Sequence, residues 1–284
     1  MELFYIITNH SKDTELKVTN QIKDYLLKCG KECIIDAGKK DENGKYYTDT
    51  ANIPANVDCV IVLGGDGTLL QAAADLVDRD IPFLGINLGT LGFLAEVNQS
   101  GITNALDQLI ADEYDIEKRL MLHGVIYEGH EIIDDCRALN DIVIARKGSL
   151  QIINFSIYVN GQLLHRYHGD GMIVATPTGS TGYSLSAGGP VVEPTADLML
   201  LTPICPHSMQ NRSIVLSPDD TIEIEIESNR DGSLQEVEAI CDGSHKVTLQ
   251  TGDRLVVKKS KKTTGIVKLS QVSFLEVLQR KLSD

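Results

Sequence analysis

One short stretch limits the possible folds more than any other. An apolar run, Val60–Leu63, meets the segment GGDGT at residues 64–68, and a helical pattern follows at once. A short apolar run that ends in glycines before a helix is typical of a parallel strand buried in an α/β sheet. Ligands bind such sheets beyond the carboxyl ends of the strands, where glycines let the backbone approach a phosphate. The segment therefore predicts a phosphate-binding loop that comprises Gly64, Gly65, Gly67 and Thr68.

Asp66 needs a separate explanation, because a carboxylate repels phosphate. It is expected either to coordinate Mg²⁺ or to accept a proton from a substrate hydroxyl. The alternative is a tight turn with a helix-capping aspartate, since Asp-Gly is common in turns.

The first 119 residues alternate strand and helix patterns, which favours a mostly parallel sheet covered by helices. Ser11 is expected to cap the first helix, and Gly30 to end it. The polar segment 39–52 is expected to be a flexible loop. The expected strands cover residues 3–7, 32–37, 59–65 and 81–87, and the later helices cover residues 69–77 and 102–110.

The pattern after Arg119 is β-rich. Asn160-Gly161 between two strand patterns predicts a hairpin, and the segment TIEIEIES at 221–228 alternates with period two. We therefore expect an N-terminal α/β domain at 1–119, a β-rich domain at 120–264, and a tail at 265–284 that packs back on the first domain.

Composition excludes several classes of protein. The formal net charge of −14 argues against nucleic-acid binding, and the one basic cluster, Lys258–Lys262, is expected to be a solvated hairpin edge. No run approaches eighteen apolar residues, so no membrane span is expected, and a membrane is not expected among the partners. The N-terminus is expected to be a strand and not a signal peptide. The six cysteines form no C-x-x-C pair and are expected to be reduced thiols in a cytoplasmic protein.

A second unusual segment runs from His168 to Val192 and is rich in glycine, serine and threonine. Backbone N–H groups and small hydroxyls suit sugar and phosphate oxygens. A flexible linker is the alternative, but apolar residues precede the segment and Pro177 and Pro190 stiffen it. Asn140-Asp141, read alone, is a turn or a strand start. The chain has neither a G-x-G-x-x-G after the first strand nor a G-x-x-x-x-G-K-[ST] motif.

Taken together, these motifs resemble those of the NAD kinases of the bacterial type. The resemblance covers essentially the whole chain, and TPTGSTGYSLSAGGP at 176–190 is far more specific than GGDG, which lipid kinases and phosphofructokinases share. The matching segments are GGDGT at 64–68, GTLGFL at 89–94, Asn140-Asp141, Asp170-Gly171, residues 176–184, Gly188-Gly189-Pro190 and Pro206-His207.

The resemblance implies a Rossmann-like α/β domain and an all-β, β-sandwich domain, with NAD bound between them. It implies transfer of a phosphoryl group from ATP, or from polyphosphate, to the adenosine 2′-hydroxyl of NAD to give NADP. Mg²⁺ or another divalent cation is expected, but no metal ligand is assigned. A homotetramer or homodimer is expected, with NAD and ATP as the other partners.

The resemblance also implies roles for individual residues. Asp66 matches the proton acceptor, Asn140 and Asp141 would hold the adenine and its ribose, and Asp170 would reach the nicotinamide end. Three positions depart from the family pattern: Asp141 stands for glutamate, His168 for arginine, and Gly182 for alanine. The expected NAD-binding residues are Asp66, Gly67, Phe93, Asn140, Asp141, Gln151, His168, Asp170, Thr181, Gly182, Tyr183, Ser184, Leu185 and Ser186.

Two other functions fit parts of the sequence. A lipid or sugar kinase would share GGDG, but the acidic chain lacks a basic amphipathic segment for a lipid surface, and a sugar kinase leaves the second segment unexplained. A non-catalytic NAD-binding sensor would have no need of Asp66.

Overall fold

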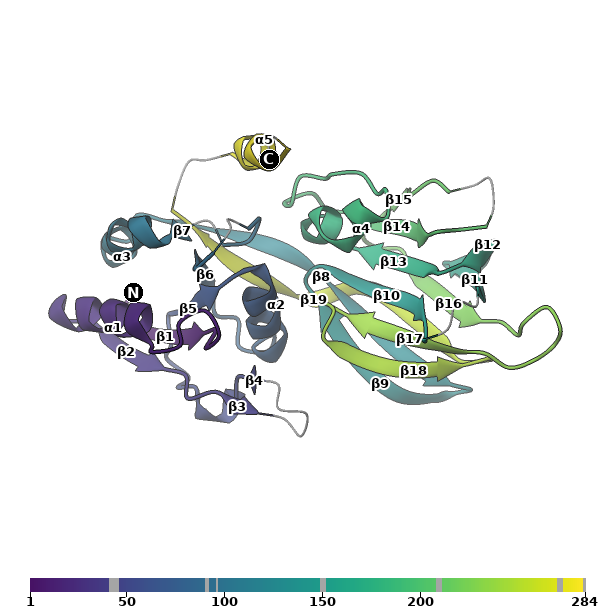
Figure 1. Cartoon of the computed structure of the whole chain (residues 1–284), viewed down its shortest axis with the longest axis horizontal. Helices are drawn as coiled ribbons and strands as arrows, with labels where there is room; N and C mark the ends of the chain where they lie inside the picture. The colour runs from purple at the N-terminus through teal and green to yellow at the C-terminus, as the bar shows by residue number, and fades with distance from the viewer. Residues whose placement is uncertain are drawn as a thin grey trace. The chain divides into compact units, whose positions relative to one another are not determined.

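The structure, a computed structural model, describes residues 1–40, 46–89, 92–95, 97–148, 152–207, 211–269 and 273–282. It divides into two compact units, residues 1–119 with 262–284, and residues 120–261 (Figure 1). Strand β19 (Arg254–Lys268) runs from the second unit into the first, so the predicted domain boundary at residue 264 falls within one strand.

The first unit is built on a parallel sheet with the strand order β2-β1-β5-β6. Strands β1, β5 and β6 are buried along their whole length, as their unbroken apolar runs require when helices cover both faces. These strands are β1 (Leu3–Thr8), β2 (Glu32–Ile35), β5 (Cys59–Gly64) and β6 (Phe83–Asn87), and the short β7 (Val97–Asn98) pairs with β6.

Helices cover the two faces of this sheet. Helices α1 (Lys17–Lys28) and α3 (Ile102–Ile110) share one core with alternate residues of the strands, among them Leu84 and Ile86. Helix α2 (Asp66–Asp75) lies on the opposite face, where Leu69 packs against Gly85. Because neighbouring strand residues point to opposite faces, the position of Gly85 between Leu84 and Ile86 places α1 and α2 on different sides.

Two expectations about this unit are wrong in detail. Ser11 does not cap α1: the carboxylate of Asp13 accepts the N–H groups of Val18 and Thr19, and Leu16 precedes the helix in a left-handed conformation. The segment 39–52 is not one loop. It contains the paired strands β3 (Lys39–Lys40) and β4 (Tyr46–Tyr47) and the 3-10 helix η1 (Thr50–Asn52), while residues 41–45 lie outside the described residues.

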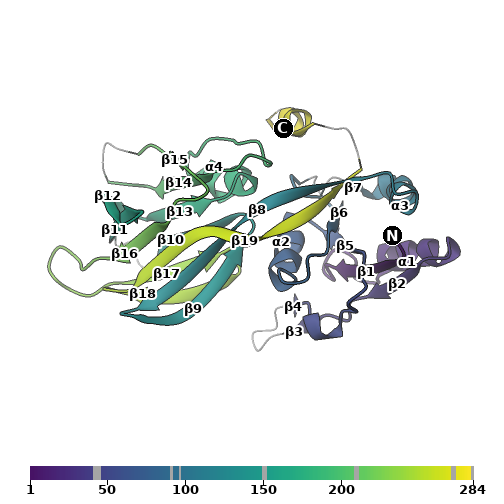
Figure 2. The same cartoon turned by 180° about the vertical axis from the view of Figure 1, so that it is seen from behind.

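The second unit is a β-sandwich, so the expected combination of an α/β part with an all-β part is confirmed. One sheet has the order β15-β14-β13-β10-β17-β18, and the other contains β12-β11-β16-β19, with β8 beside β19 and β9 beside β8 (Figure 2, from behind). One apolar core contains residues of both sheets. The strands are β8 (Asp115–Glu128), β9 (Glu131–Ala138), β10 (Asp141–Arg146), β11 (Ile153–Val159), β12 (Gln162–Gly169), β13 (Gly171–Ala175), β14 (Met199–Ile204), β15 (Ile214–Leu216), β16 (Ile222–Ile226), β17 (Glu236–Cys241) and β18 (His245–Gln250).

The local sequence signals in this unit correspond to real elements, with one exception. Asn160 and Gly161 both have positive φ in the turn between β11 and β12, and β16 alternates buried and half-buried residues. Lys258–Lys262 is not a hairpin edge, because it lies within the fifteen-residue strand β19.

The tail ends in helix α5 (Phe274–Leu282), which belongs to the first unit, and the ring of Phe274 lies 6.3 Å from that of Phe93. The 3-10 helix η2 (Gln99–Gly101) precedes α3.

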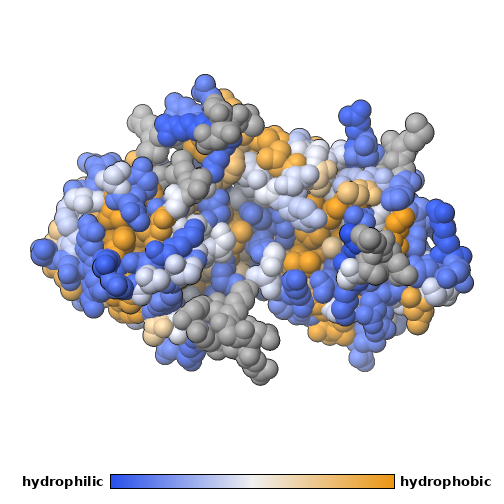
Figure 3. Space-filling view, viewed as in Figure 1, coloured by the Kyte–Doolittle hydropathy of each residue, from blue (hydrophilic) through white to orange (hydrophobic). Residues whose placement is uncertain are grey.

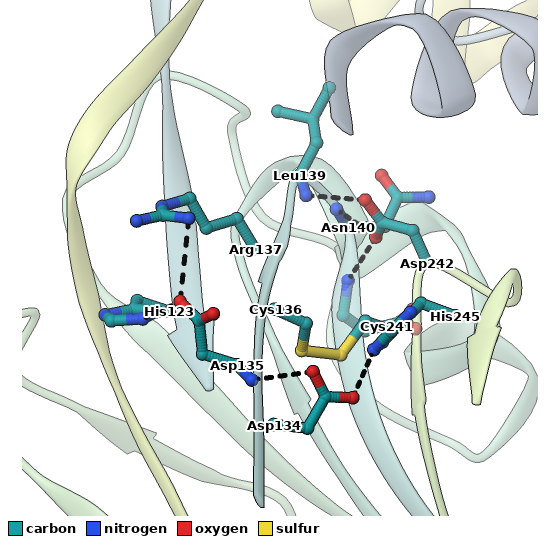
Figure 4. The surroundings of a disulfide bond; sticks show 11 residues. His123, Asp134, Asp135, Cys136, Arg137, Leu139, Asn140, Cys241, Asp242 and His245 are labelled. Atoms are coloured by element: carbon teal, nitrogen blue, oxygen red, sulfur yellow. Dashed lines mark hydrogen bonds and ion pairs between the residues drawn. A yellow bond between two sulfur atoms is a disulfide. The ribbon is translucent and has the colours of Figure 1, made fainter. Parts of the chain in front are cut away.

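The expectation that every cysteine is a reduced thiol is wrong. Cys136 of β9 and Cys241 of β17 form a disulfide, although 105 residues separate them in the sequence (Figure 4). Cysteine spacing could not reveal this pair, because strands distant in sequence bring the sulfurs together. The other cysteines are free, namely Cys29, Cys33, Cys59 and Cys205.

Within the described ranges, no helix has the length and apolar character needed to cross a bilayer. On the face shown in Figure 3, hydrophilic residues are interspersed with smaller hydrophobic groups.

Candidate functional site

The carboxyl end of β5 forms the first part of the candidate site. Gly64 is the last residue of β5, Gly65 precedes α2, and Asp66, Gly67 and Thr68 form the first turn of that helix. The helix thus begins three residues earlier than the expected Leu69. Since the first N–H groups of a helix have no partner within it, this strand end presents donors and a positive dipole to an anion.

Asp66 lies in a cage of backbone donors. Its carboxylate accepts the N–H groups of Phe93 at 2.8 Å, Leu94 at 3.2 Å and Ala95 at 3.3 Å. These contacts fix the carboxylate against the loop that follows β6. A carboxylate offers about four acceptor positions, so three backbone donors leave one for a substrate hydroxyl.

Glycines make this close packing possible. A Cβ on Gly92 would lie within 2.5 Å of all three heavy atoms of the Asp66 carboxylate. A Cβ on Gly64 would overlap the side chain of Thr68. By contrast, a Cβ on Gly67 would meet no atom within 4 Å, so the fold itself does not require that glycine.

The donor set here suits a divalent cation held mainly by a substrate. Among the described residues, no group of three or more His, Cys, Asp or Glu side chains could hold a metal. Asp66 offers one carboxylate, and Asn87 at the end of β6 offers an amide oxygen that accepts the N–H of Gly89 at 2.7 Å. Mg²⁺ commonly uses one or two carboxylates together with phosphates and water. The residues therefore fit Mg²⁺ that arrives with a phosphate ligand.

The Asn140-Asp141 pair forms part of a second cluster, in the β-sandwich. The carboxylate of Asp242 accepts the N–H groups of Leu139 at 2.7 Å, Asn140 at 2.8 Å and Asp141 at 3.0 Å (Figure 4). The Asp242 N–H in turn donates to the Asp141 carbonyl oxygen. Asp242 directly follows β17, so the end of one strand fixes the start of its neighbour β10.

Two carboxyl groups close together give this cluster an unusual titration. Burial, and then the negative charge of Asp242, raises the pKa of Asp141 to about 7. Burial also raises the pKa of Asp242, but its three backbone donors favour the charged form. Of the two groups, Asp141 therefore has the higher pKa, and its protonated carboxyl can donate a hydrogen bond as well as accept one.

The glycine-rich segment is ordered and folds against Asn140. It forms the 3-10 helix η3 (Thr178–Thr181) and the short helix α4 (Tyr183–Ser186). The N–H of Thr176 donates to the Asn140 carbonyl oxygen at 2.9 Å, and a Cβ on Gly179 would overlap the Asn140 backbone. These contacts favour a built binding loop over a flexible linker.

Within this loop the expected ligand-lining residues differ in exposure. Tyr183 and Leu185 are exposed apolar side chains, and Ser186 is exposed too. Ser184 is buried, and its hydroxyl bonds that of Thr202 at 3.1 Å. The Thr181 hydroxyl donates to the Thr178 carbonyl oxygen. Half-buried Gly182 stands beside the Asn140 amide and the Asp141 carboxylate, where an added Cβ would lie 3.4 and 3.8 Å away.

The remaining expected residues lie near the end of β12. The carboxylate of Asp170 pairs with the Arg146 guanidinium at 3.2 Å. His168 bonds the side-chain oxygen of Asn154 through Nδ1, and burial lowers its pKa, so the ring is neutral at pH 7. Where the family pattern has arginine, this chain thus has an uncharged side chain. Gln151 lies outside the described residues.

Sequence reasoning missed two residues of these clusters. Asp242 gave no signal, because its three partners lie more than 100 residues away. Lys12, in the loop after β1, places its ammonium beside the strand-end glycines: a Cβ on Gly65 would lie 3.1 Å from Nζ and one on Gly89 would lie 3.6 Å from it. Only the neighbouring positions of β1, β5 and β6 could reveal this.

Comparison with known proteins gives one consistent result. A family model described as the ATP-NAD kinase N-terminal domain matches residues 4–114, and one described as the ATP-NAD kinase C-terminal domain matches residues 139–269. The chain is 46% identical to an NAD kinase of Lachnospira eligens, over 99% of this chain and 100% of that protein. It is 44% identical to an NAD kinase of Lachnoclostridium phytofermentans, over 100% of both.

Solved structures agree with the sequence comparisons. Yeast NADH kinase in complex with NADH aligns with a TM-score of 0.87 and 27% identity, covering 100% of this chain and 88% of that one. An NAD kinase from Archaeoglobus fulgidus in complex with ATP aligns with a TM-score of 0.77 and 25% identity, covering 100% and 99%.

Proposed function

The chain belongs to the NAD kinase family, and from that premise we propose that Asp66 is the catalytic base that accepts the proton of the adenosine 2′-hydroxyl of NAD. The enzyme is a phosphotransferase that uses ATP to phosphorylate NAD to NADP. The observation that carries the proposal is the Asp66 carboxylate, fixed by three backbone donors at the end of β5.

The reaction balances as a single displacement. The ribose 2′-oxygen forms a bond to the terminal phosphorus of ATP, and the bond from that phosphorus to the bridging oxygen breaks. The electron pair of the broken bond leaves with ADP, and the ribose proton passes to Asp66. A base within hydrogen-bond reach contributes roughly 10²–10⁴-fold to such a step. Mg²⁺, which we propose enters with the donor, offsets the phosphate charge when bound.

The proposed NAD-binding residues have distinct roles. Asn140 and Asp141 hold the adenine and ribose, and the protonated Asp141 carboxyl can donate to a ribose oxygen despite being shorter than glutamate. The exposed ring of Tyr183 offers a stacking surface for the adenine. Phe93, Gln151, His168, Asp170, Thr181, Gly182, Ser184, Leu185 and Ser186 complete the proposed set, with Gly64, Gly65, Gly67 and Thr68 on the donor phosphates.

Two further proposals concern assembly and location. A homodimer or homotetramer is the proposed assembly, and the exposed side chains of Leu163 and Leu164 on β12 and, separately, of Ile132 on β9 are candidates for its interfaces. Sedimentation that shows only a 31.0 kDa species at micromolar concentration would contradict this. We also propose a cytoplasmic enzyme, because ATP and NAD are its substrates. The Cys136–Cys241 bridge is not typical of a reducing compartment. Labelling of thiols in intact cells therefore tests the location: reduced Cys136 and Cys241 would support the cytoplasm, and an intact bridge would contradict it.

The test compares the parent with Asp66→Asn. NAD, ATP and Mg²⁺ are incubated with each protein, and NADP is measured with an NADP-specific dehydrogenase. Asp66→Asn should bind NAD nearly normally and lose turnover by at least about 10²-fold. Asp24→Asn, an exposed change on α1, is the matched control and should behave as the parent.

The outcomes separate the alternatives. Turnover of Asp66→Asn within about threefold of the parent would make Asp66 a turn residue rather than a base. Binding of NAD without any NADP from the parent would indicate a sensor, and turnover of a lipid or sugar instead of NAD would indicate another GGDG kinase. Polyphosphate in place of ATP is tested in the same assay.

A further inference from the structure

The order of strands identifies one crevice in the first unit. Strands β1 and β5 are neighbours, but the chain leaves β1 toward β2 on one side and leaves β5 toward β6 on the other. The connecting helices, α1 and α2, lie on opposite faces of the sheet, so the loops after β1 and β5 diverge. Ligands of open α/β sheets bind at such a switch point, beyond the carboxyl ends of the two strands.

Lys12 stands at this crevice on a firmly built loop. The Lys12 N–H donates to the Asn9 carbonyl oxygen at 2.9 Å, and the Asn9 side chain donates to the Thr68 hydroxyl at 3.2 Å, which ties the loop to the first turn of α2. The next residue, Asp13, is buried and bonds the hydroxyl of Thr19. The backbone that carries Lys12 is therefore fixed relative to the glycine segment.

The Lys12 ammonium faces the strand-end glycines, and among the described residues no acid forms an ion pair with it. Its Nζ lies beside Gly65 and Gly89, at the ends of β5 and β6. None of the ion pairs among the described residues involves this ammonium, and the side chain is exposed. Side chains larger than hydrogen at residues 65 and 89 would occupy the space beside it. The result is a positive charge beside the strand-end glycines and the N-terminus of α2.

We propose that Lys12 binds the terminal phosphates of the phosphoryl donor. This inference rests on the proposed function, since it assigns a residue to the donor side of that site. A phosphate here would meet the α2 N-terminus, the N–H groups of the glycine segment and the ammonium together. During transfer, negative charge spreads over the oxygens of the moving group, and the Lys12 ammonium stabilises that charge. Asp66, on the same turn, then serves the acceptor hydroxyl and not the phosphate.

The test uses the full-length protein with Lys12→Met and Lys12→Arg. Inorganic tripolyphosphate, which has the donor's chain of three phosphates but no adenosine, is titrated calorimetrically in the absence of NAD, and the KM values for ATP and NAD are measured separately. Loss of one hydrogen bond to a charged group weakens binding by roughly 10- to 100-fold. Lys12→Met should show that loss for tripolyphosphate and ATP while NAD affinity stays within about threefold, and Lys12→Arg should recover most of it.

Lys17→Met is the matched control, because it also removes one lysine charge, at the first residue of α1, five residues after Lys12. Lys17 is 79% exposed and pairs with exposed Glu15, so Lys17→Met should change neither the affinity for tripolyphosphate nor the KM values for ATP and NAD. Equal tripolyphosphate and ATP constants in Lys12→Met and the parent would overturn the inference, and so would a loss confined to NAD. A parent that makes no NADP would refute the proposed function, while the tripolyphosphate titration would still decide the role of Lys12.

Discussion

Gly92→Ala should disable Asp66 without changing its chemistry. A Cβ at residue 92 would lie within 2.5 Å of every heavy atom of the Asp66 carboxylate. Real contacts of this kind start near 3.0 Å, so even the most distant of these atoms must retreat by about 0.5 Å. The bonds from the Leu94 and Ala95 N–H groups, at 3.2 and 3.3 Å, are already long and would break.

The magnitude follows from those two bonds. Hydrogen bonds to a charged group contribute roughly 1.5–3 kcal/mol each, so Gly92→Ala should reduce the free energy of unfolding by about 3 kcal/mol. A displaced catalytic group also costs about 10²-fold in kcat, as for a misplacement on the order of 1 Å. Urea unfolding of the protein without ligands and kcat at saturating NAD and ATP measure the two effects separately.

Gly67→Ala is the control for folding, since a Cβ there meets nothing within 4 Å and the residue lies inside α2. Alanine is the better helix former, so this variant should gain up to about 1 kcal/mol. If Gly92→Ala unfolded within about 0.5 kcal/mol of the parent and kept its kcat, the contact between residue 92 and the Asp66 carboxylate would not exist as described.

Three further predictions concern the β-sandwich unit. Because the pKa of Asp141 is raised from 3.8 to about 7, the folded protein holds a proton that the unfolded chain releases, so stability should fall as pH rises from about 4 to about 7. The slope approaches about 1.4 kcal/mol per pH unit. The free energy of unfolding of Asp141→Asn should depend less on pH across this range, and an equal pH dependence in the two proteins would show that Asp141 stays ionised in the folded parent. Asp242→Ala leaves the three N–H groups of residues 139–141 without their acceptor and should lower unfolding free energy by about 3 kcal/mol and raise the KM for NAD at least about tenfold; an unchanged KM would separate this contact from NAD binding. Thiol titration in denaturant should find four thiols without reductant and six with it, because Cys136 and Cys241 are bridged; six in both cases would rule the bridge out.

Features that depend on near neighbours in the chain were predictable. The buried strands β1, β5 and β6 follow from unbroken apolar runs, and the hairpin at Asn160-Gly161 follows from a local preference for positive φ. The glycine segment after β5 also indicated a ligand-binding role, because few purely structural requirements explain several glycines at a strand end. Where the local signal was ambiguous, it failed: Ser11 is a good cap by type, but Asp13 sits nearer the first helical N–H groups.

The sequence by itself thus determined the class of fold, the glycine-bearing strand end with Asp66, and the family. Only the tertiary structure decided which residues support them. Lys12 reaches Gly65 because β1 and β5 are adjacent in the sheet, and Asp242 reaches Asn140 because β17 pairs with β10 across a separation of 102 residues. Strand pairing sets these contacts, and it depends on the packing of whole sheets, so no local pattern of residues can encode it.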